Sequence, residues 1–163
     1  MNDNIEKNRI ETGIKDTFYK SLNEINHWSV DRLNDLRQEA IDNFINIGLP
    51  GKNDERYKYT DILKIFSHDY SLSLTPQDIN LDIDDIFSCD IPDLKTQTVI
   101  VMNGRFFIKH NKEAIHPGGL IIDSLINAAE KYPDLINKYF NQQAEKSEDS
   151  LVHLNTAFAQ DGI

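Results

Sequence analysis

The spacing of apolar residues changes once along this chain of 163 residues, at about Gln97. Before that point, residues 4–26 and 30–47 carry apolar side chains three or four positions apart, which is typical of helices buried along one face. After it, residues 96–110 (TQTVIVMNGRFFIKH) place β-branched and aromatic runs on both sides of Asn103-Gly104. Such a pair predicts a β-hairpin, because both central residues of a type I′ turn need positive φ. We therefore expect an α+β fold.

The two helical segments have recognisable ends. In the first, the apolar stripe consists of Ile5, Ile10, Ile14, Phe18, Leu22 and Ile25. In the second, we expect Ser29 at the N-cap, Gly48 just past the end and Pro50 as a stop. Its apolar face is formed by Val30, Leu33, Leu36, Ala40, Ile41, Phe44 and Ile47. Thr60 is then expected to cap a short helix over residues 61–66.

The chain divides into three regions on this pattern. Residues 1–66 form an N-terminal helical hairpin region, and residues 67–96 an acidic, irregular connector in which Thr75-Pro76 opens one helical turn. Residues 97–163 form a mixed unit of a β-hairpin and short helices. Its helices are expected at 124–132, 133–140 and 151–160.

Charge and cysteine content narrow the class of protein. The chain has 27 acidic and 17 basic residues, a net charge of −10, and this field repels nucleic acid and anionic membranes. It has no run of about 18 apolar residues and no apolar signal segment near its start, so we expect no membrane contact. Cys89 is the single cysteine, which favours a reducing compartment, and the cytoplasm is the expected location.

No constellation in the sequence predicts catalysis. The histidines at positions 27, 68, 110, 116 and 153 lack metal-ligand spacing, so we expect no metal site. Cys89 lies among Asp84, Asp85 and Asp90, and nearby acids raise the pKa of a thiol. An enzyme would need His116 or His153 to meet Cys89 or an acid in a pocket. We expect that the protein is not an enzyme.

The stretch GLPGKNDERYKYTDI, residues 48–62, allows two interpretations. Its bases and tyrosines could bind nucleic acid through phosphate contacts and stacking. Alternatively, its charges pair locally and its tyrosines pack under the second helix. The second interpretation is favoured because acids nearly match bases within the stretch. It predicts that Tyr57 and Tyr59 are largely buried.

Several motifs, in the same order over about 125 residues, resemble the N-terminal signature of SufD in the SufB/SufD family. The residues that carry the resemblance are Arg37, Ala40, Phe44, Gly48, Leu49, Pro50, Glu55, Arg56, Tyr57, Lys58, Tyr59, Thr60, Asn103, Gly104, Leu154, Asn155, Thr156, Ala157, Phe158, Asp161 and Gly162. Residues 119–140 also resemble the family's strand-then-helix segment. Residues 1 to about 30 match only in being helical.

The resemblance implies a role in iron–sulfur cluster assembly. SufD-like proteins pair with SufB and the ATPase SufC in a scaffold complex, and they continue from a helical N-terminal part into a right-handed β-helix. This chain would be that N-terminal part, with the β-helix absent and expected after Ile163. Partners would be SufB-like and SufC-like subunits, and the full complex would handle the cluster, with no catalytic, cofactor or metal residues here. The alternative is a stand-alone protein-interaction module unrelated to clusters.

Overall fold

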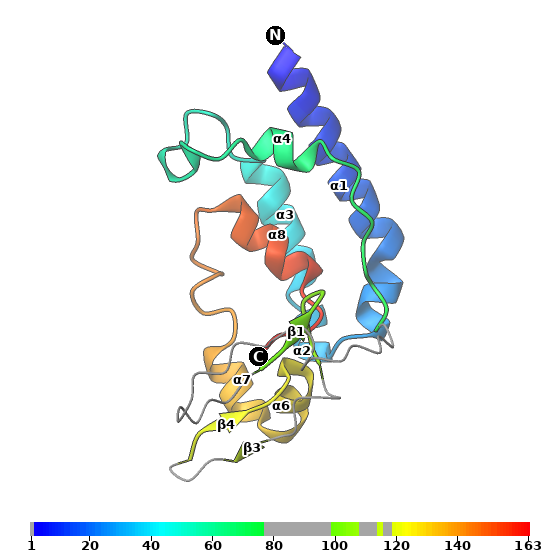
Figure 1. The fold of residues 1–163 in the computed structure, drawn as a ribbon, viewed down its shortest axis with the longest axis vertical. Coiled ribbons are helices and arrows are strands. Elements are labelled where there is room, and N and C mark those ends of the chain that lie inside the picture. The colour runs from blue at the N-terminus through cyan, green and yellow to red at the C-terminus, as the bar shows by residue number, and fades with distance from the viewer. Residues whose placement is uncertain (1, 77–98, 108–113, 116–118) are drawn as a thin grey trace, which may run out of the picture.

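The computed structural model describes residues 2–76, 99–107, 114–115 and 119–163 (Figure 1). Its helices are α1 (Asn2–His27), α2 (Asp31–Asn34), α3 (Arg37–Ile47), the 3₁₀ turn η1 (Glu55–Tyr57), α4 (Ile62–Phe66), α6 (Leu125–Lys131), α7 (Pro133–Tyr139) and α8 (Ser150–Phe158). Two antiparallel pairs of short strands join β1 (Val101–Met102) to β2 (Arg105–Phe106) and β3 (Ala114–Ile115) to β4 (Ile121–Ile122). This mixture is consistent with the expected α+β class.

The core lies among three helices, one of which comes from the end of the chain. α1 and α3 run antiparallel, and α8 packs against both of them (Figure 1). Phe18 of α1 and Phe44 of α3 are fully buried beside Ala157 of α8. Each fully buried side chain of this size contributes about 1.5–3 kcal/mol relative to exposure. The helical hairpin therefore closes its core only with a helix that begins more than a hundred residues later.

The apolar stripe predicted along the first helix is confirmed over most of its length. Ile10, Phe18 and Ile25 are buried, and Ile14 and Leu22 pack at the edge of the core. Ile5 is an exception, because 68% of it is exposed. The first turns of α1 extend past the end of α3, so no neighbouring helix covers them (Figure 1).

The second predicted helix is interrupted, and its predicted cap is wrong. A turn at Asp35-Leu36 separates α2 from α3, and the N-cap of α2 is Val30, without a side-chain hydrogen bond. The Ser29 hydroxyl instead accepts a hydrogen bond from Arg37 Nη2 at 2.9 Å. A buried guanidinium needs acceptors around it, and this demand takes Ser29 away from the helix end.

The end of α3 follows the prediction, and the cap of α4 does not. Gly48 adopts φ +77°, and its N–H donates to Phe44 O at 2.7 Å. A side chain here would lie 2.7 Å from Glu11 Oε1, the atom that accepts from Leu49 N, so glycine is required. At α4, Asp61 and not Thr60 is the cap, with Oδ1 accepting from Lys64 N at 3.0 Å. A carboxylate also interacts favourably with the helix dipole there.

The predicted hairpin and the short helices that follow are confirmed. Asn103 and Gly104 have φ of 50° and 79°, as a type I′ turn requires. Ser124 caps α6 by accepting from Asn127 N at 3.0 Å, and Pro133 is the first residue of α7. The last helix, expected over 151–160, spans 150–158 in the structure. Thr75 and Pro76 are described, but the rest of the helical turn predicted to open there, the remainder of the acidic connector and Cys89 lie outside the described residues.

Candidate functional site

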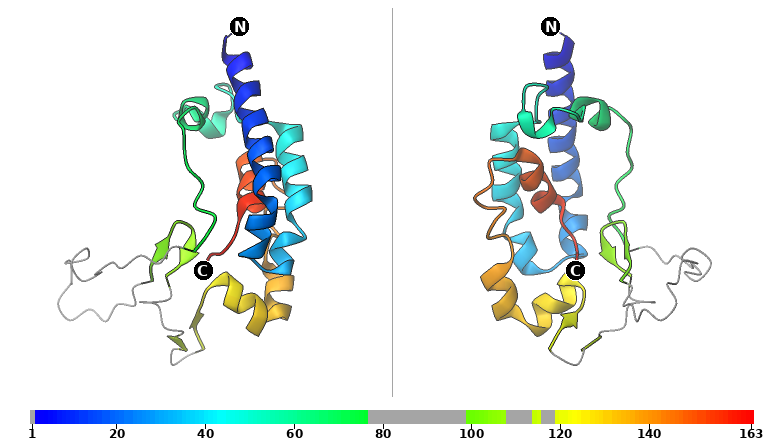
Figure 2. Two further views of the ribbon diagram at one scale, coloured as in Figure 1. Left: turned by 90° about the vertical axis from the view of Figure 1, so that its right-hand side faces the viewer. Right: turned by 60° about the vertical axis from the view of Figure 1, so that its left-hand side comes forward.

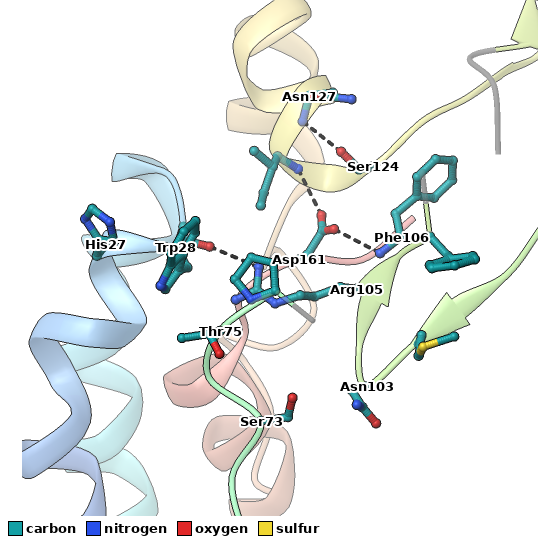
Figure 3. Close-up of a pocket in the computed structure, with 15 residues that line it drawn as sticks. His27, Trp28, Ser73, Thr75, Asn103, Arg105, Phe106, Ser124, Asn127 and Asp161 are labelled. Atoms are coloured by element: carbon teal, nitrogen blue, oxygen red, sulfur yellow. Dashed lines mark hydrogen bonds between the residues drawn. The ribbon is translucent and has the colours of Figure 1, made fainter. Parts of the chain in front are cut away.

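Signature residues from two distant parts of the chain meet where the C-terminal segment crosses the hairpin. Asp161 Oδ2 accepts a hydrogen bond from Phe106 N at 3.0 Å, and Asp161 Oδ1 accepts from Ile126 N at 3.2 Å (Figure 3). Next along the chain, Gly162 O accepts from Leu125 N at 3.0 Å. One carboxylate thus joins the strand that follows Asn103-Gly104 to the first turn of α6.

Arg105 connects the same junction to the helical core. Its Nη2 donates to Gln160 Oε1 at 2.6 Å and to Leu74 O at 2.9 Å, and its Nη1 donates to Trp28 O at 3.3 Å. Burial lowers the pKa of this guanidinium, and the nearby charge of Asp161 partly opposes that effect. Its acceptors are neutral oxygens of Trp28 just after α1, of Leu74 in the connector and of Gln160 in the C-terminal segment, so Arg105 holds three parts of the chain together.

The junction encloses a pocket of about 410 Å³ beside the hairpin (Figure 3). Trp28, Met102, Phe106 and Phe107 line it together with Asn127 and Asp161. The polar groups on its wall are largely engaged with one another, since Asp161 accepts two backbone hydrogen bonds and Ser124 accepts one. The arrangement is suited to holding elements in place rather than to proton transfer.

The stretch at residues 48–62 forms a second cluster, which fastens its loop to α8. Tyr57 Oη donates to Asp149 Oδ2 at 2.6 Å, and Asp149 Oδ1 also caps α8 by accepting from Leu151 N at 3.0 Å. Burial and the hydrogen bond to Asp149 raise the pKa of Tyr57 to about 12. Arg56 pairs with Asp54 at 2.7 Å, which lowers the pKa of Asp54 and raises that of Arg56.

The predicted local pairing of charges in this stretch is confirmed for Arg56 and Lys58 but not for Lys52, and the predicted burial of both tyrosines is wrong. Lys52 pairs with Asp3 at 2.9 Å and Lys58 with Glu55 at 3.5 Å. Tyr57 is half-buried, whereas 95% of Tyr59 is exposed. Tyr57 is held by Asp149, and the turn after it directs Tyr59 to solvent. With each basic residue beside an acid, the stretch lacks the positive field that phosphate binding needs.

Arg37 was singled out by the sequence only as a motif residue, yet it is central to the packing. It is 1% exposed, and it donates from Nη1 to Ala157 O at 2.9 Å and from Nε to Asn26 Oδ1 at 3.0 Å and Asn34 Oδ1 at 3.2 Å. Burial lowers its pKa to about 10. No pattern in the sequence indicated a buried cation, because its acceptors lie on three separate helices.

The other signature residues divide between core and surface. Gly48, Pro50 and Ala157 are buried and Leu154 is half-buried. Exposed members are Glu55, Arg56, Lys58, Thr60, Asn103, Gly104 and Asn155. The exposed set lies on the loop, on the hairpin and, for Asn155, on α8.

Among the described residues, no three His, Cys, Asp or Glu side chains come together in a way that could hold a metal ion. His153 is buried, with Nε2 2.8 Å from Ser147 O, while His116 and Cys89 lie outside the described part. None of the described helices has both the length and the apolar character needed to cross a bilayer.

Comparisons with known proteins show similarity over nearly the whole chain. Residues 8–163 match the sequence model of the family described as the SufBD protein N-terminal region. The chain is also 25% identical, over 179 aligned positions, to the Arabidopsis thaliana iron-sulfur cluster assembly SufBD family protein ABCI9. That match covers 98% of this chain and 37% of the relative, so the chain spans little more than a third of the relative's length. No solved structure is significantly similar to it.

Proposed function

This chain belongs to the SufBD family, as the N-terminal region of such a protein, and from that premise we propose that it acts in iron–sulfur cluster assembly. The proposed role is that of a SufD-like scaffold subunit in the cytoplasm, non-catalytic and working through protein contacts. Its partners would be SufB-like and SufC-like subunits. The cluster would be the cargo of the whole complex.

The observation that carries this proposal is the family match over residues 8–163. The geometry adds support, because the signature residues hold elements together. Asp161 joins hairpin to helix, Tyr57 joins loop to α8, and Arg37 joins the helices of the core. A region whose distinctive residues fix its own shape suits a scaffold that presents a rigid surface.

The same geometry suggests how the region would connect to a following β-helix. The segment 160–162 is held between the hairpin and α6, so its position relative to both is fixed. We propose that this junction sets the first strand of a right-handed β-helix. Substitution of Asp161 would then disturb the register of that first strand more than the helical core.

Co-purification tests the proposal directly. Full-length protein carrying an affinity tag is expected to recover SufB-like and SufC-like subunits, and deletion of its gene is expected to lower the activity of iron–sulfur enzymes. Absence of both effects would contradict the proposal and favour a stand-alone interaction module.

A pair of variants tests the junction in the same strain. Asp161→Ala is expected to reduce recovery of the complex. The control is Asp42→Ala, at an exposed α3 residue that accepts hydrogen bonds from the exposed Gln38, and it should leave recovery unchanged. Equal recovery with both variants would show that the junction does not matter for assembly.

A further inference from the structure

Residues 69–75 read Asp-Tyr-Ser-Leu-Ser-Leu-Thr, with apolar and polar residues in strict alternation. Alternation with a period of two is typical of a β-strand that is half-buried. In the structure this segment runs as a stretched piece of chain beside α1, and no strand pairs with it in the described part of the protein (Figures 1 and 2). The sequence pattern of a strand is present here without its hydrogen-bonded neighbour.

The backbone of this segment is held at both ends and unpaired between them. At the start, His68 N donates to Ile65 O, and at the end Leu74 O accepts from Arg105 and Gln160. Within the described residues, no hydrogen bond reaches the backbone of residues 69–73. Tyr70 and Leu72 are 64% and 47% exposed. An ordered extended backbone with free N–H and C=O groups is a template for one more strand.

An apolar groove of about 790 Å³ lies between this segment, α1 and α8. Ile14, Phe66, Leu154 and Phe158 line it, and all four are core side chains left partly exposed. Gly13 of α1 lies in the same wall, and a Cβ built on it would meet no atom within 4 Å. The groove can therefore accept side chains from a strand laid along the segment.

We propose that residues 69–73 and this groove bind an extended segment of a different protein, which adds to them as a β-strand. The five residues span about 16 Å, close to the length of an average strand. Apolar side chains at alternate positions of the incoming segment would enter the groove. Because this chain carries a net charge of −10, a second copy would be repelled, and a neutral or basic partner fits. The surface exists whether or not the protein acts in cluster assembly.

The probe is a library of random nonapeptides displayed on phage and selected against the 163-residue chain. We expect enriched peptides with apolar residues at every second position and few acidic residues. Binding of one enriched peptide is then measured by fluorescence anisotropy. Hydrogen exchange should show fast-exchanging amides at residues 70–73 in the free chain, and protection of every second one of these amides in the complex, because successive N–H groups of a strand point to opposite edges.

Two substitutions test the site, one in the backbone of the segment and one in the wall of the groove. Ser71→Pro removes a backbone donor, and Gly13→Trp fills the groove. Each should weaken binding about tenfold or more, and for Ser71→Pro this loss equals one or two net hydrogen bonds. Matched controls are Ser71→Thr, which keeps the donor, and Lys15→Trp, which places the same ring at an exposed α1 position outside the groove. Both controls should bind as the unmodified chain does.

Several results would overturn the proposal. Enrichment of peptides with apolar residues at helical spacing would replace strand addition by helix binding. Failure to enrich any peptide pattern, or unchanged binding by both Ser71→Pro and Gly13→Trp, would remove the site. Protection of the amides of residues 70–73 in the free chain would mean that another part of this chain already pairs with them.

Discussion

Replacement of the buried Arg37 by methionine should destabilise the protein by about 3 kcal/mol. Three guanidinium nitrogens donate to Asn26, Asn34, Ser29 and Ala157, and hydrogen bonds from a charged group contribute about 1.5–3 kcal/mol each. The cost of burying the cation opposes this gain. Burial lowers the pKa of Arg37 to about 10, and that shift corresponds to a cost of roughly 3 kcal/mol. Methionine keeps much of the packing volume but leaves Ala157 O, at the end of α8, without a donor.

Equilibrium unfolding in urea, followed by circular dichroism, measures this loss. For a domain of this size, about 3 kcal/mol corresponds to a fall in Tm of about 6–12 °C. Arg9→Met is the matched control, because the Arg9 side chain is largely exposed and its nearest carboxylate oxygen, on Glu6, is 3.9 Å away. Such a surface change should stay within about 0.5 kcal/mol. If Arg37→Met were as stable as the control, the hydrogen bonds would merely offset the buried charge, and the reasoning would be refuted.

Three further predictions concern single contacts. Gly48→Ala should lower the stability by about 1–2 kcal/mol, because of the positive φ of Gly48 and the clash with Glu11. Gly13→Ala should instead raise the stability by up to about 1 kcal/mol, and thermal melts compare the two variants. Tyr57→Phe should cost about 1 kcal/mol at neutral pH. Because the folded pKa of Tyr57 lies near 12, above its ordinary value, the unmodified chain should lose stability between about pH 10 and 12, and this variant should lose less; denaturation at several pH values tests the difference. In Asp161→Asn the side chain can no longer accept from both backbone N–H groups in the same way. Hydrogen exchange at residues 105–107 and 125–127 should therefore become faster, while exchange in α1 and α3 changes little. Equal effects throughout would show that the junction and the core unfold together.

Local chemistry made part of the fold predictable. Gly48 and Asn103-Gly104 act through their own backbone conformation, and each was predicted in its role. Ser124 acts on a residue three positions away, and the start of a helix was predicted there without its capping role. Ser29 and Thr60 carry the same kind of local signal, but a buried guanidinium recruits Ser29 and a neighbouring carboxylate replaces Thr60. Short-range patterns cannot show which of two capable residues a distant partner will engage.

The candidate site was less accessible to sequence reasoning. Asp161-Gly162 reads as a turn, yet the Asp161 carboxylate joins Phe106 to Ile126, residues 55 and 35 positions away. Tyr57 and Asp149 are separated by 92 positions. The motifs identify the residues, and only the packing of α8 against the first helices shows what they contact. Tyr59 is exposed although it belongs to the same run of aromatic and charged residues as Tyr57. Nothing in that run distinguishes a tyrosine ring held by a hydrogen bond from one that points into solvent.

The position of α8 also has a kinetic consequence. The hydrogen bond from Arg37 to Ala157 joins residues 120 positions apart, and the apolar faces of α1 and α3 lack their cover until α8 has been synthesised. At about 5–20 residues per second, the ribosome would take roughly 6–24 s to cross that interval. During that time the nascent chain would expose Phe18 and Phe44 to chaperones, and folding of the N-terminal helices would wait for the synthesis of α8.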